Sequence, residues 1–310
     1  MIKGDDIRRS YSICSTSSDN ELRVAVKEVE NGLFSSFANR ELKTGDTMDV
    51  MVPNGTFTVS PNAGNTSNYV FYAAGSGITP IMSMIRSILE TESGSQIFLY
   101  YGNKTAADTI FKSNLDELAG RYPNFHLTYI FSREETGDSH THGRIDEDKC
   151  AHFYAKELAP LSLDGIYGCG PQEMIETVKD FYISKGLLHK FHYELFTATT
   201  NPSDLEAPQP STGGNVVNSD VTVIIDDEAY NFSLSTSGSS ILQAAQDKGA
   251  DVPFSCKGGV CCTCRAKILE GTVSMDMNFA LEEDEVEQGF ILTCQSHPTS
   301  ERVIISYDEY

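Results

Sequence analysis

The sequence contains no uninterrupted apolar run of about 18 residues, the length that a membrane-spanning helix requires. Its first six residues, MIKGDD, are polar and carry no hydrophobic segment of a secretory signal. Basic side chains are scarce, since 23 lysines and arginines stand against 44 acidic residues and give a formal charge of −21. Nucleic acids and anionic membranes attract basic surfaces. We therefore expect a cytoplasmic protein with no nucleic-acid or membrane partner.

Motifs of several common enzyme classes are also missing, because the chain carries no Ser-His-Asp arrangement, P-loop or metalloprotease motif. Its 310 residues, 40% of them hydrophobic, suffice for two or three compact domains. A run rich in proline, serine, glycine and asparagine predicts a linker at 201–218. A second, less distinct domain boundary is predicted near 60–65, where turn residues precede an apolar segment.

Between these two breaks, apolar runs alternate with segments of helical periodicity. The runs 69–74, 96–101, 126–131 and 164–169 predict strands, and 78–89, 110–122 and 172–185 predict helices. Such an alternation, with strands apolar on both faces, indicates a parallel α/β sheet.

The regions on either side of this segment show strand patterns. Short strands are expected at 11–15, 21–29 and 47–52, in keeping with a small β-barrel. After the linker, 221–225 and 230–234 predict a hairpin, followed by a helix over 239–248 that starts with a serine cap and stops at Gly249.

Four of the eight cysteines lie close together between positions 256 and 264. Cys256, Cys261 and Cys264 have the spacing C-x4-C-x2-C, and Cys294 follows after 29 intervening residues. This is the plant-type spacing for the four ligands of a [2Fe–2S] cluster. The pattern therefore predicts a ferredoxin domain that carries one electron at a time at low potential.

A zinc site is the alternative for such cysteines, but it normally uses two C-x2-C pairs, and here Cys294 stands alone. The spacing favours the cluster. Cys262 is left over, and we expect it to fill space as a small apolar side chain.

Two glycine-containing segments follow predicted strands. Gly75, Gly77, Thr79 and Pro80 lie where a strand leads into a helix, a place where backbone N–H groups bind a pyrophosphate. A second segment, Gly168-Cys169-Gly170-Pro171, ends a later strand of the same predicted sheet. Ligands of α/β sheets bind at these carboxyl ends.

Together with Arg9-Ser10-Tyr11-Ser12, these motifs resemble the ferredoxin–NADP reductase family over essentially the whole chain. The resemblance implies three modules: a partial antiparallel β-barrel that binds FAD (1–60), an α/β parallel-sheet domain that binds NAD(P) (61–200), and, after the linker at 201–218, a β-grasp ferredoxin domain (219–310). Family members have further barrel strands before R-x-Y-S, so we expect this barrel to lack its opening strands.

The resemblance also assigns roles to residues that match the family motifs. Arg9 would pair with the FAD pyrophosphate, Tyr11 would pack on the isoalloxazine, and Ser12 would lie near flavin N5. Gly32 and Ser35 match a second phosphate segment, and Gly75, Gly77, Thr79 and Pro80 match the nicotinamide-nucleotide loop. The positions expected to act at the nicotinamide and flavin rings are Cys169, Gly170, Glu194 and Phe196.

Ser132 and Arg133 follow a predicted strand, where family members that prefer NADP carry a 2′-phosphate clamp. A guanidinium suits a phosphate dianion, and Arg144 is placed to assist. NADPH is therefore favoured over NADH, with a solvated surface arginine as the alternative. His140 and His142 lie in a polar loop that offers no further metal ligands, so we expect no metal there.

The ferredoxin segment 219–310 carries 16 acidic and 5 basic side chains, with an acidic helical turn at 281–287. This turn is either a solvated helix or an electrostatic docking face. The family resemblance implies a reductase that passes electrons from NADPH through FAD and the cluster to an oxygenase component. The alternatives within the class are reductases of a Rieske ring hydroxylase or of a steroid monooxygenase. Outside it, a chain that binds no flavin would be a one-electron carrier.

Overall fold

The computed structural model describes residues 7–196 and 217–309, which form two compact units. The parallel-sheet unit comprises residues 11–47 and 56–196, and the mixed-sheet unit comprises 7–10, 48–55 and 217–309. Most of the linker predicted at 201–218 lies outside the described residues, and strand β6 already begins at Asn218.

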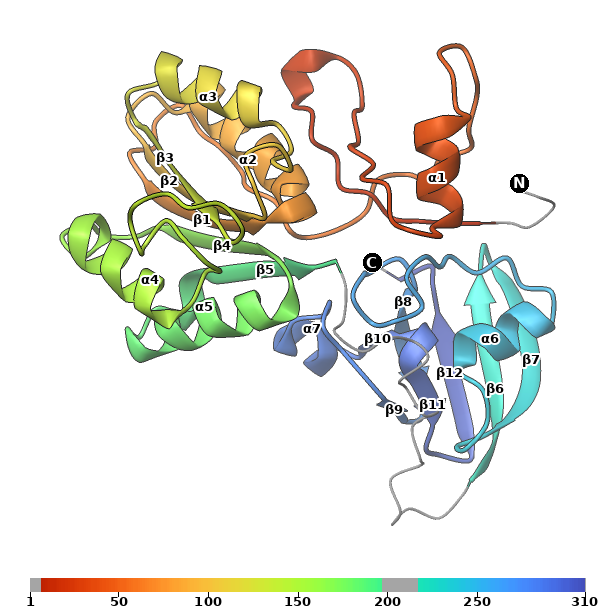
Figure 1. Cartoon of the computed structure of the whole chain (residues 1–310). Coiled ribbons are helices and arrows are strands. Elements are labelled where there is room, and N and C mark those ends of the chain that lie inside the picture. The colour runs from red at the N-terminus through yellow and green to blue at the C-terminus, as the bar shows by residue number, and fades with distance from the viewer. Residues whose placement is uncertain (1–6, 197–216, 310) are drawn as a thin grey trace. The chain divides into compact units, whose positions relative to one another are not determined.

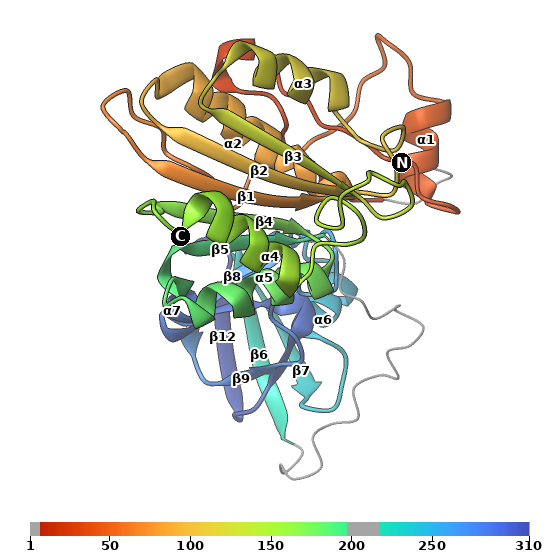
Figure 2. The ribbon, with the colours of Figure 1, turned by 60° about the vertical axis from the view of Figure 1, so that its left-hand side comes forward.

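The parallel-sheet unit is built around five parallel strands in the order β3-β2-β1-β4-β5. Helices α2 and α3 cover one face of this sheet, and α4 and α5 cover the other (Figures 1 and 2). The elements are α1 (Leu33–Arg40), β1 (Asn68–Ala74), α2 (Ile78–Thr91), β2 (Gln96–Asn103), α3 (Lys112–Arg121), β3 (Phe125–Phe131), α4 (Glu147–Phe153), β4 (Gly165–Gly170), α5 (Gln172–Ser184) and β5 (Phe191–Leu195).

The central strand β1 explains why both faces need a helical layer. Phe71 stacks on Tyr167 on one face, with ring centroids 5.1 Å apart. On the other face Tyr72 packs against Tyr100 at 5.1 Å and shares a 3.1 Å hydrogen bond with the hydroxyl of Tyr182. All these rings are buried, so the strand is covered on both of its faces. The predicted α/β sheet is confirmed.

The mixed-sheet unit contains a five-stranded sheet in the order β10-β8-β12-β6-β7 and a two-stranded sheet of β9 and β11. Its elements are β6 (Asn218–Ile225), β7 (Glu228–Ser235), α6 (Ile241–Asp247), β8 (Arg265–Glu270), β9 (Val273–Met275), α7 (Glu283–Glu287), β10 (Phe290–Leu292), β11 (Ser296–Pro298) and β12 (Arg302–Ser306).

The predicted hairpin is the β6–β7 pair, which turns at Asp226 and Asp227 with φ of 52° and 62°. Short polar side chains tolerate this left-handed backbone conformation. Helix α6 follows, with Ser240 accepting a hydrogen bond from the backbone N–H of Gln243 as the N-cap. Its residues Ile241 and Leu242 enter the core of the unit. Hairpin, helix and a strand β12 parallel to β6 give the expected β-grasp arrangement.

The three strands expected at 11–15, 21–29 and 47–52 are not continuous in the described residues. An antiparallel bridge joins Ile13 to Val24, and the Cys14 N–H donates to the Arg23 carbonyl at 2.8 Å. A strand exists only where a neighbour accepts its hydrogen bonds along its length. The pairing between residues 13 and 24 is antiparallel, as expected, but it consists of a single bridge. Helix α1 follows it in the chain.

None of the helices in the described ranges 7–196 and 217–309 is both long and apolar enough to cross a membrane.

Candidate cofactor sites

The first site lies at the carboxyl edge of the parallel sheet, where β1 leads into α2 through a short turn at Gly75–Gly77. Gly75 has φ +54°, and a Cβ built there would meet nothing within 4 Å, so its backbone borders open space. Thr79 donates a hydrogen bond from its hydroxyl to the Ser76 carbonyl at 3.0 Å and closes the turn. Pro80, in the first turn of α2, has no N–H to leave unpaired. This geometry fits a pyrophosphate at the start of α2.

Strand β4 passes directly behind this turn. A Cβ on Gly77 would lie 2.1 Å from the carbonyl oxygen of Cys169, so only glycine permits this approach. The Cys169 side chain is fully buried. Burial, and secondarily the negative charge of Glu194, raise the pKa of its thiol well above the ordinary value. Cys169 is therefore a neutral thiol at physiological pH and is not suited to nucleophilic attack.

Three of the expected active residues meet at this edge. Cys169 pairs in register with Glu194 on β5, and the Ser12 hydroxyl donates to Glu194 Oε2 at 3.2 Å. Phe196, just beyond β5, is partly buried against the apolar core under α2. Residues 182 positions apart in sequence are thus hydrogen-bonded beside the nucleotide turn.

The remaining residues expected to bind FAD make their contacts with other parts of the protein. Tyr11 packs on Phe34 with ring centroids 5.4 Å apart. Gly32 is the N-cap of α1, but the Ser35 hydroxyl is buried and accepts a hydrogen bond from the backbone N–H of Val29 at 3.1 Å. Ser35 therefore stabilises the start of α1. The Arg9 side chain is exposed and donates to the Arg8 carbonyl at 2.7 Å.

Ser132 and Arg133 lie where β3 ends, and their backbone N–H groups donate to the carbonyls of Asn103 and Lys104, each at 2.9 Å. The Arg133 side chain is exposed at this same carboxyl edge. Arg144, expected to assist it, instead pairs with Glu173 at 2.9 Å in an exposed ion pair.

The two loop histidines have protein partners. His140 lies 3.2 Å from Asp138 and stacks on His152, and His142 bonds the Glu134 carbonyl at 3.0 Å. Within residues 7–196 and 217–309, no three Cys, His, Asp or Glu side chains surround one point as a single metal ion would require. A two-iron cluster is a different case, because it divides four thiolates between two irons.

The second site is the group of four cysteines in the mixed-sheet unit. Cys256, Cys261 and Cys264 lie in the loop between α6 and β8, and Cys294 lies in the turn between β10 and β11. The sulfurs of Cys256 and Cys261 are 3.1 Å apart, and the Gly258 N–H donates to Cys256 Sγ at 3.4 Å. This N–H···S contact is of the kind that stabilises cluster thiolates.

The pKa values of these thiols indicate the charge of the group that they bind. A hydrogen bond with Cys256 lowers the pKa of Cys294, but contact with Cys264 and burial outweigh it and raise that pKa to about 12. The pKa of Cys261 is likewise raised, first by its hydrogen bond with Cys256 and then by burial. Thiols this close become thiolates only against positive charge, which iron supplies. The donor set therefore fits a [2Fe–2S] cluster.

Sequence reasoning missed Gln295, which ties the two parts of this site together. Its side-chain amide donates to the Lys257 carbonyl at 3.0 Å and to the Cys294 carbonyl at 3.1 Å, and it lies 3.8 Å from Cys294 Sγ. The signal was its place next to the fourth cysteine. Cys262 points elsewhere, since its Sγ donates to the Ala280 carbonyl at 3.3 Å.

Comparison with protein families agrees with this division of sites. The chain matches an oxidoreductase FAD-binding domain over residues 1–59, an oxidoreductase NAD-binding domain over 71–180 and a 2Fe-2S iron–sulfur cluster binding domain over 223–299. The molecule is therefore an oxidoreductase that uses FAD, a pyridine nucleotide and a [2Fe–2S] cluster.

More specifically, the chain belongs to the ferredoxin–NADP reductase family, among the members with a C-terminal ferredoxin domain. It is 38% identical over 307 residues to a subunit of the 1,2-phenylacetyl-CoA epoxidase from Escherichia coli, covering 98% of this chain and 85% of that protein. It is 30% identical to the ferredoxin reductase component of a 3-ketosteroid-9-alpha-monooxygenase from Mycobacterium tuberculosis, covering 98% and 81%. Phthalate dioxygenase reductase shares the fold with a TM-score of 0.55 at 22% identity, covering 96% and 83%.

The assignment of the cluster ligands predicts different fates for neighbouring cysteines. Cys256→Ser should abolish the long-wavelength visible absorption of the purified protein, because three thiolates and a weak hydroxyl ligand do not retain the cluster. Cys262→Ser, six residues along the same loop, is the matched control and should keep the full spectrum and iron content. Equal loss of iron in both variants would contradict the assignment.

Proposed function

We propose that this chain takes a hydride from NADPH onto FAD and passes the two electrons singly through its [2Fe–2S] cluster to an oxygenase component that acts on phenylacetyl-CoA. The observation that carries the proposal is the meeting of Ser12, Cys169 and Glu194 beside the nucleotide turn in one compact unit. The oxygenase is inferred from the 38% identity to the phenylacetyl-CoA epoxidase subunit over nearly the whole chain.

FAD supplies the conversion of a two-electron hydride donor into single electrons, and the cluster carries them one at a time. The protein's own residues hold the partners in place. In our proposal Ser12, whose hydroxyl donates to Glu194, would lie near flavin N5, and the neutral thiol of Cys169 would lie beside the nicotinamide ring with Gly170. Phe196, just beyond β5, would cover the flavin. No residue needs to act as a strong acid or base.

Other assignments complete this proposal. Arg9, Tyr11, Gly32 and Ser35 serve FAD, with the Ser35 hydroxyl acting through the start of α1. The residues proposed for the nucleotide are Gly75, Gly77, Thr79, Pro80, Ser132 and Arg133, and those proposed for iron are Cys256, Cys261, Cys264 and Cys294. We also propose that the boundaries between the modules lie near residues 60, 200 and 218. The proposed location of the protein is the cytoplasm.

The 30% identity to the reductase component of a ketosteroid monooxygenase supports a second candidate, in which the same electron path serves a steroid oxygenase. The two candidates are distinguished by mixing the reduced protein with each purified oxygenase and measuring which oxygenase it reduces.

The proposed path is tested by the visible spectrum of the purified protein under anaerobic conditions. We expect flavin and cluster bands that both bleach on addition of NADPH, because the nucleotide turn and the Ser12–Glu194 pair lie in the same unit. Cluster bands that remain unchanged, without flavin bands, would refute the reductase and leave a one-electron carrier.

The preference for NADPH is assigned to Arg133. Arg133→Ala should raise KM for NADPH about tenfold or more, because a charge-assisted hydrogen bond to phosphate contributes about 1.5–3 kcal/mol. KM for NADH should stay the same. Arg121→Ala, which removes an exposed arginine on α3, is the control. An equal change in KM for both coenzymes would contradict a 2′-phosphate clamp.

We also propose that α7 docks the oxygenase through its exposed acids. Glu285 already pairs with Arg265 at 3.3 Å, which leaves Glu283 and Asp284 facing solvent. The rate of oxygenase reduction should fall as salt rises from about 0.01 to about 0.3 M, because screening weakens such steering. The double variant Glu283→Gln/Asp284→Asn should flatten this dependence, and Glu301→Gln should not. A salt-independent rate in the unmodified protein would remove the docking role.

A further inference from the structure

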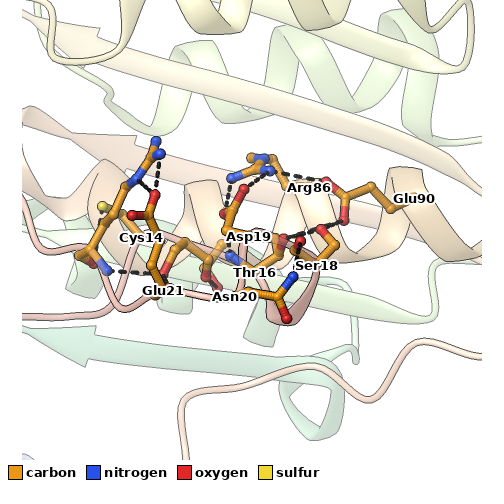
Figure 3. A network of polar contacts seen from close by, with 11 residues as sticks. Cys14, Thr16, Ser18, Asp19, Asn20, Glu21, Arg86 and Glu90 are labelled. Atoms are coloured by element: carbon orange, nitrogen blue, oxygen red, sulfur yellow. Dashed lines mark hydrogen bonds and ion pairs between the residues drawn. The ribbon is translucent and has the colours of Figure 1, made fainter.

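The segment that directly follows Ser12 lies along helix α2. Figure 3 shows this network, in which the side chains of Thr16, Ser18 and Asp19 face Arg86 and Glu90, one turn apart on the helix. All of these residues belong to the parallel-sheet unit. No sequence motif marks the contact, since its partners are 67 to 74 residues apart.

Arg86 and Asp19 form the centre of the network. Both terminal nitrogens of the guanidinium donate to the carboxylate of Asp19, at 2.6 and 2.9 Å, in a two-pronged pair that fixes distance and orientation. The side chains are only 24% and 17% exposed. The hydrogen bond from Arg86 holds the pKa of Asp19 well below its usual range, so the pair stays ionised throughout the physiological pH range.

A second set of contacts holds the same segment. Arg86 also reaches Glu90 at 3.1 Å, and Glu90 accepts hydrogen bonds from Ser18 at 2.6 Å and Thr16 at 3.3 Å. Asp19 accepts from the backbone N–H of Thr16 at 2.9 Å. One helical turn further towards the N-terminus of α2, Ser83 donates to the Ser15 carbonyl at 2.8 Å. The backbone from 15 to 19 is thus attached to α2 at both ends.

Helix α2 transmits this attachment to the nucleotide turn. It begins at Ile78, immediately after Gly75–Gly77, and Arg86 lies eight residues into it, about 12 Å along the axis at the usual rise per residue. A helix of this length is stiff compared with the loop it holds. The position of Ser12 relative to the nucleotide turn is therefore set through α2 as well as through Glu194.

We propose that Arg86 and Asp19 are positioning residues that hold the segment around Ser12 at the distance from the nucleotide turn that hydride transfer requires. The inference rests on the proposed function, in which the C4 hydride of NADPH passes to flavin N5 with uptake of one proton, leaving NADP⁺. A shift of about 1 Å between donor and acceptor costs on the order of 100-fold in rate. Loss of the pair therefore acts on the rate of the step and not on nucleotide affinity.

The kinetic test follows flavin bleaching by NADPH in an anaerobic stopped-flow instrument, on protein loaded with FAD and cluster. Asp19→Asn and Arg86→Gln should each lower the limiting rate at saturating NADPH at least tenfold, with the half-saturating NADPH concentration changed less than twofold. The double variant should be no slower than the slower single variant, because both remove one interaction. Lys112→Gln breaks the exposed Lys112–Asp116 pair on α3 and is the control that should leave the rate unchanged.

A second measurement does not depend on activity. Amide hydrogen exchange in the FAD-free protein should become faster at residues 12–16 in Asp19→Asn, and stay unchanged there in Lys112→Gln. Unchanged limiting rates, additive losses in the double variant, or unchanged exchange at 12–16 would each overturn the proposal. If NADPH fails to bleach the unmodified protein, the proposed function itself fails. If it bleaches all variants equally, only the positioning role fails.

Discussion

The close approach of the nucleotide turn to strand β4 is the constraint on which the rest of the first site depends. Gly77 lies so near the Cys169 carbonyl that any side chain would displace one of them. Because β4 pairs in register with β5, this approach also fixes Glu194, and Glu194 in turn holds Ser12. Three segments far apart in sequence are thereby brought to one edge by backbone packing, and the chemistry requires little more than their alignment.

Sequence reasoning located the buried parts of the fold closely and the exposed parts poorly, for a physical reason. Strands such as β1, buried on both faces, leave continuous apolar runs, and the prediction for 69–74 differs from β1 by one residue. The strands predicted at 11–15 and 21–29 are reduced to one antiparallel bridge, because a strand also needs partners, which the sequence does not show. The contacts of Gln295 and of Arg86 with Asp19 escaped prediction because a polar side chain does not reveal which distant group it meets.

The four-cysteine site depends on contacts between two parts of the second unit that are distant in sequence. Cys261 lies in the loop between α6 and β8, and Cys294 lies in the turn after β10. Neighbouring thiols and burial raise the pKa values of both, which fits a site whose ligands share positive charge. Gln295 donates to the carbonyls of Lys257 and Cys294 and so connects the loop to the fourth cysteine.

Positive charge is scarce in this chain, with 23 basic side chains for 44 acids, so the places where arginine is used are informative. Exposed pairs such as Arg144–Glu173 add little to stability because water screens them. Arg86 is different, since it is three-quarters buried and serves two carboxylates that would otherwise repel each other on the same surface. Without it, Asp19 and Glu90 would push the segment after Ser12 away from α2. Acidic side chains on both the 16–19 segment and α2 thus make a shielded arginine necessary between them.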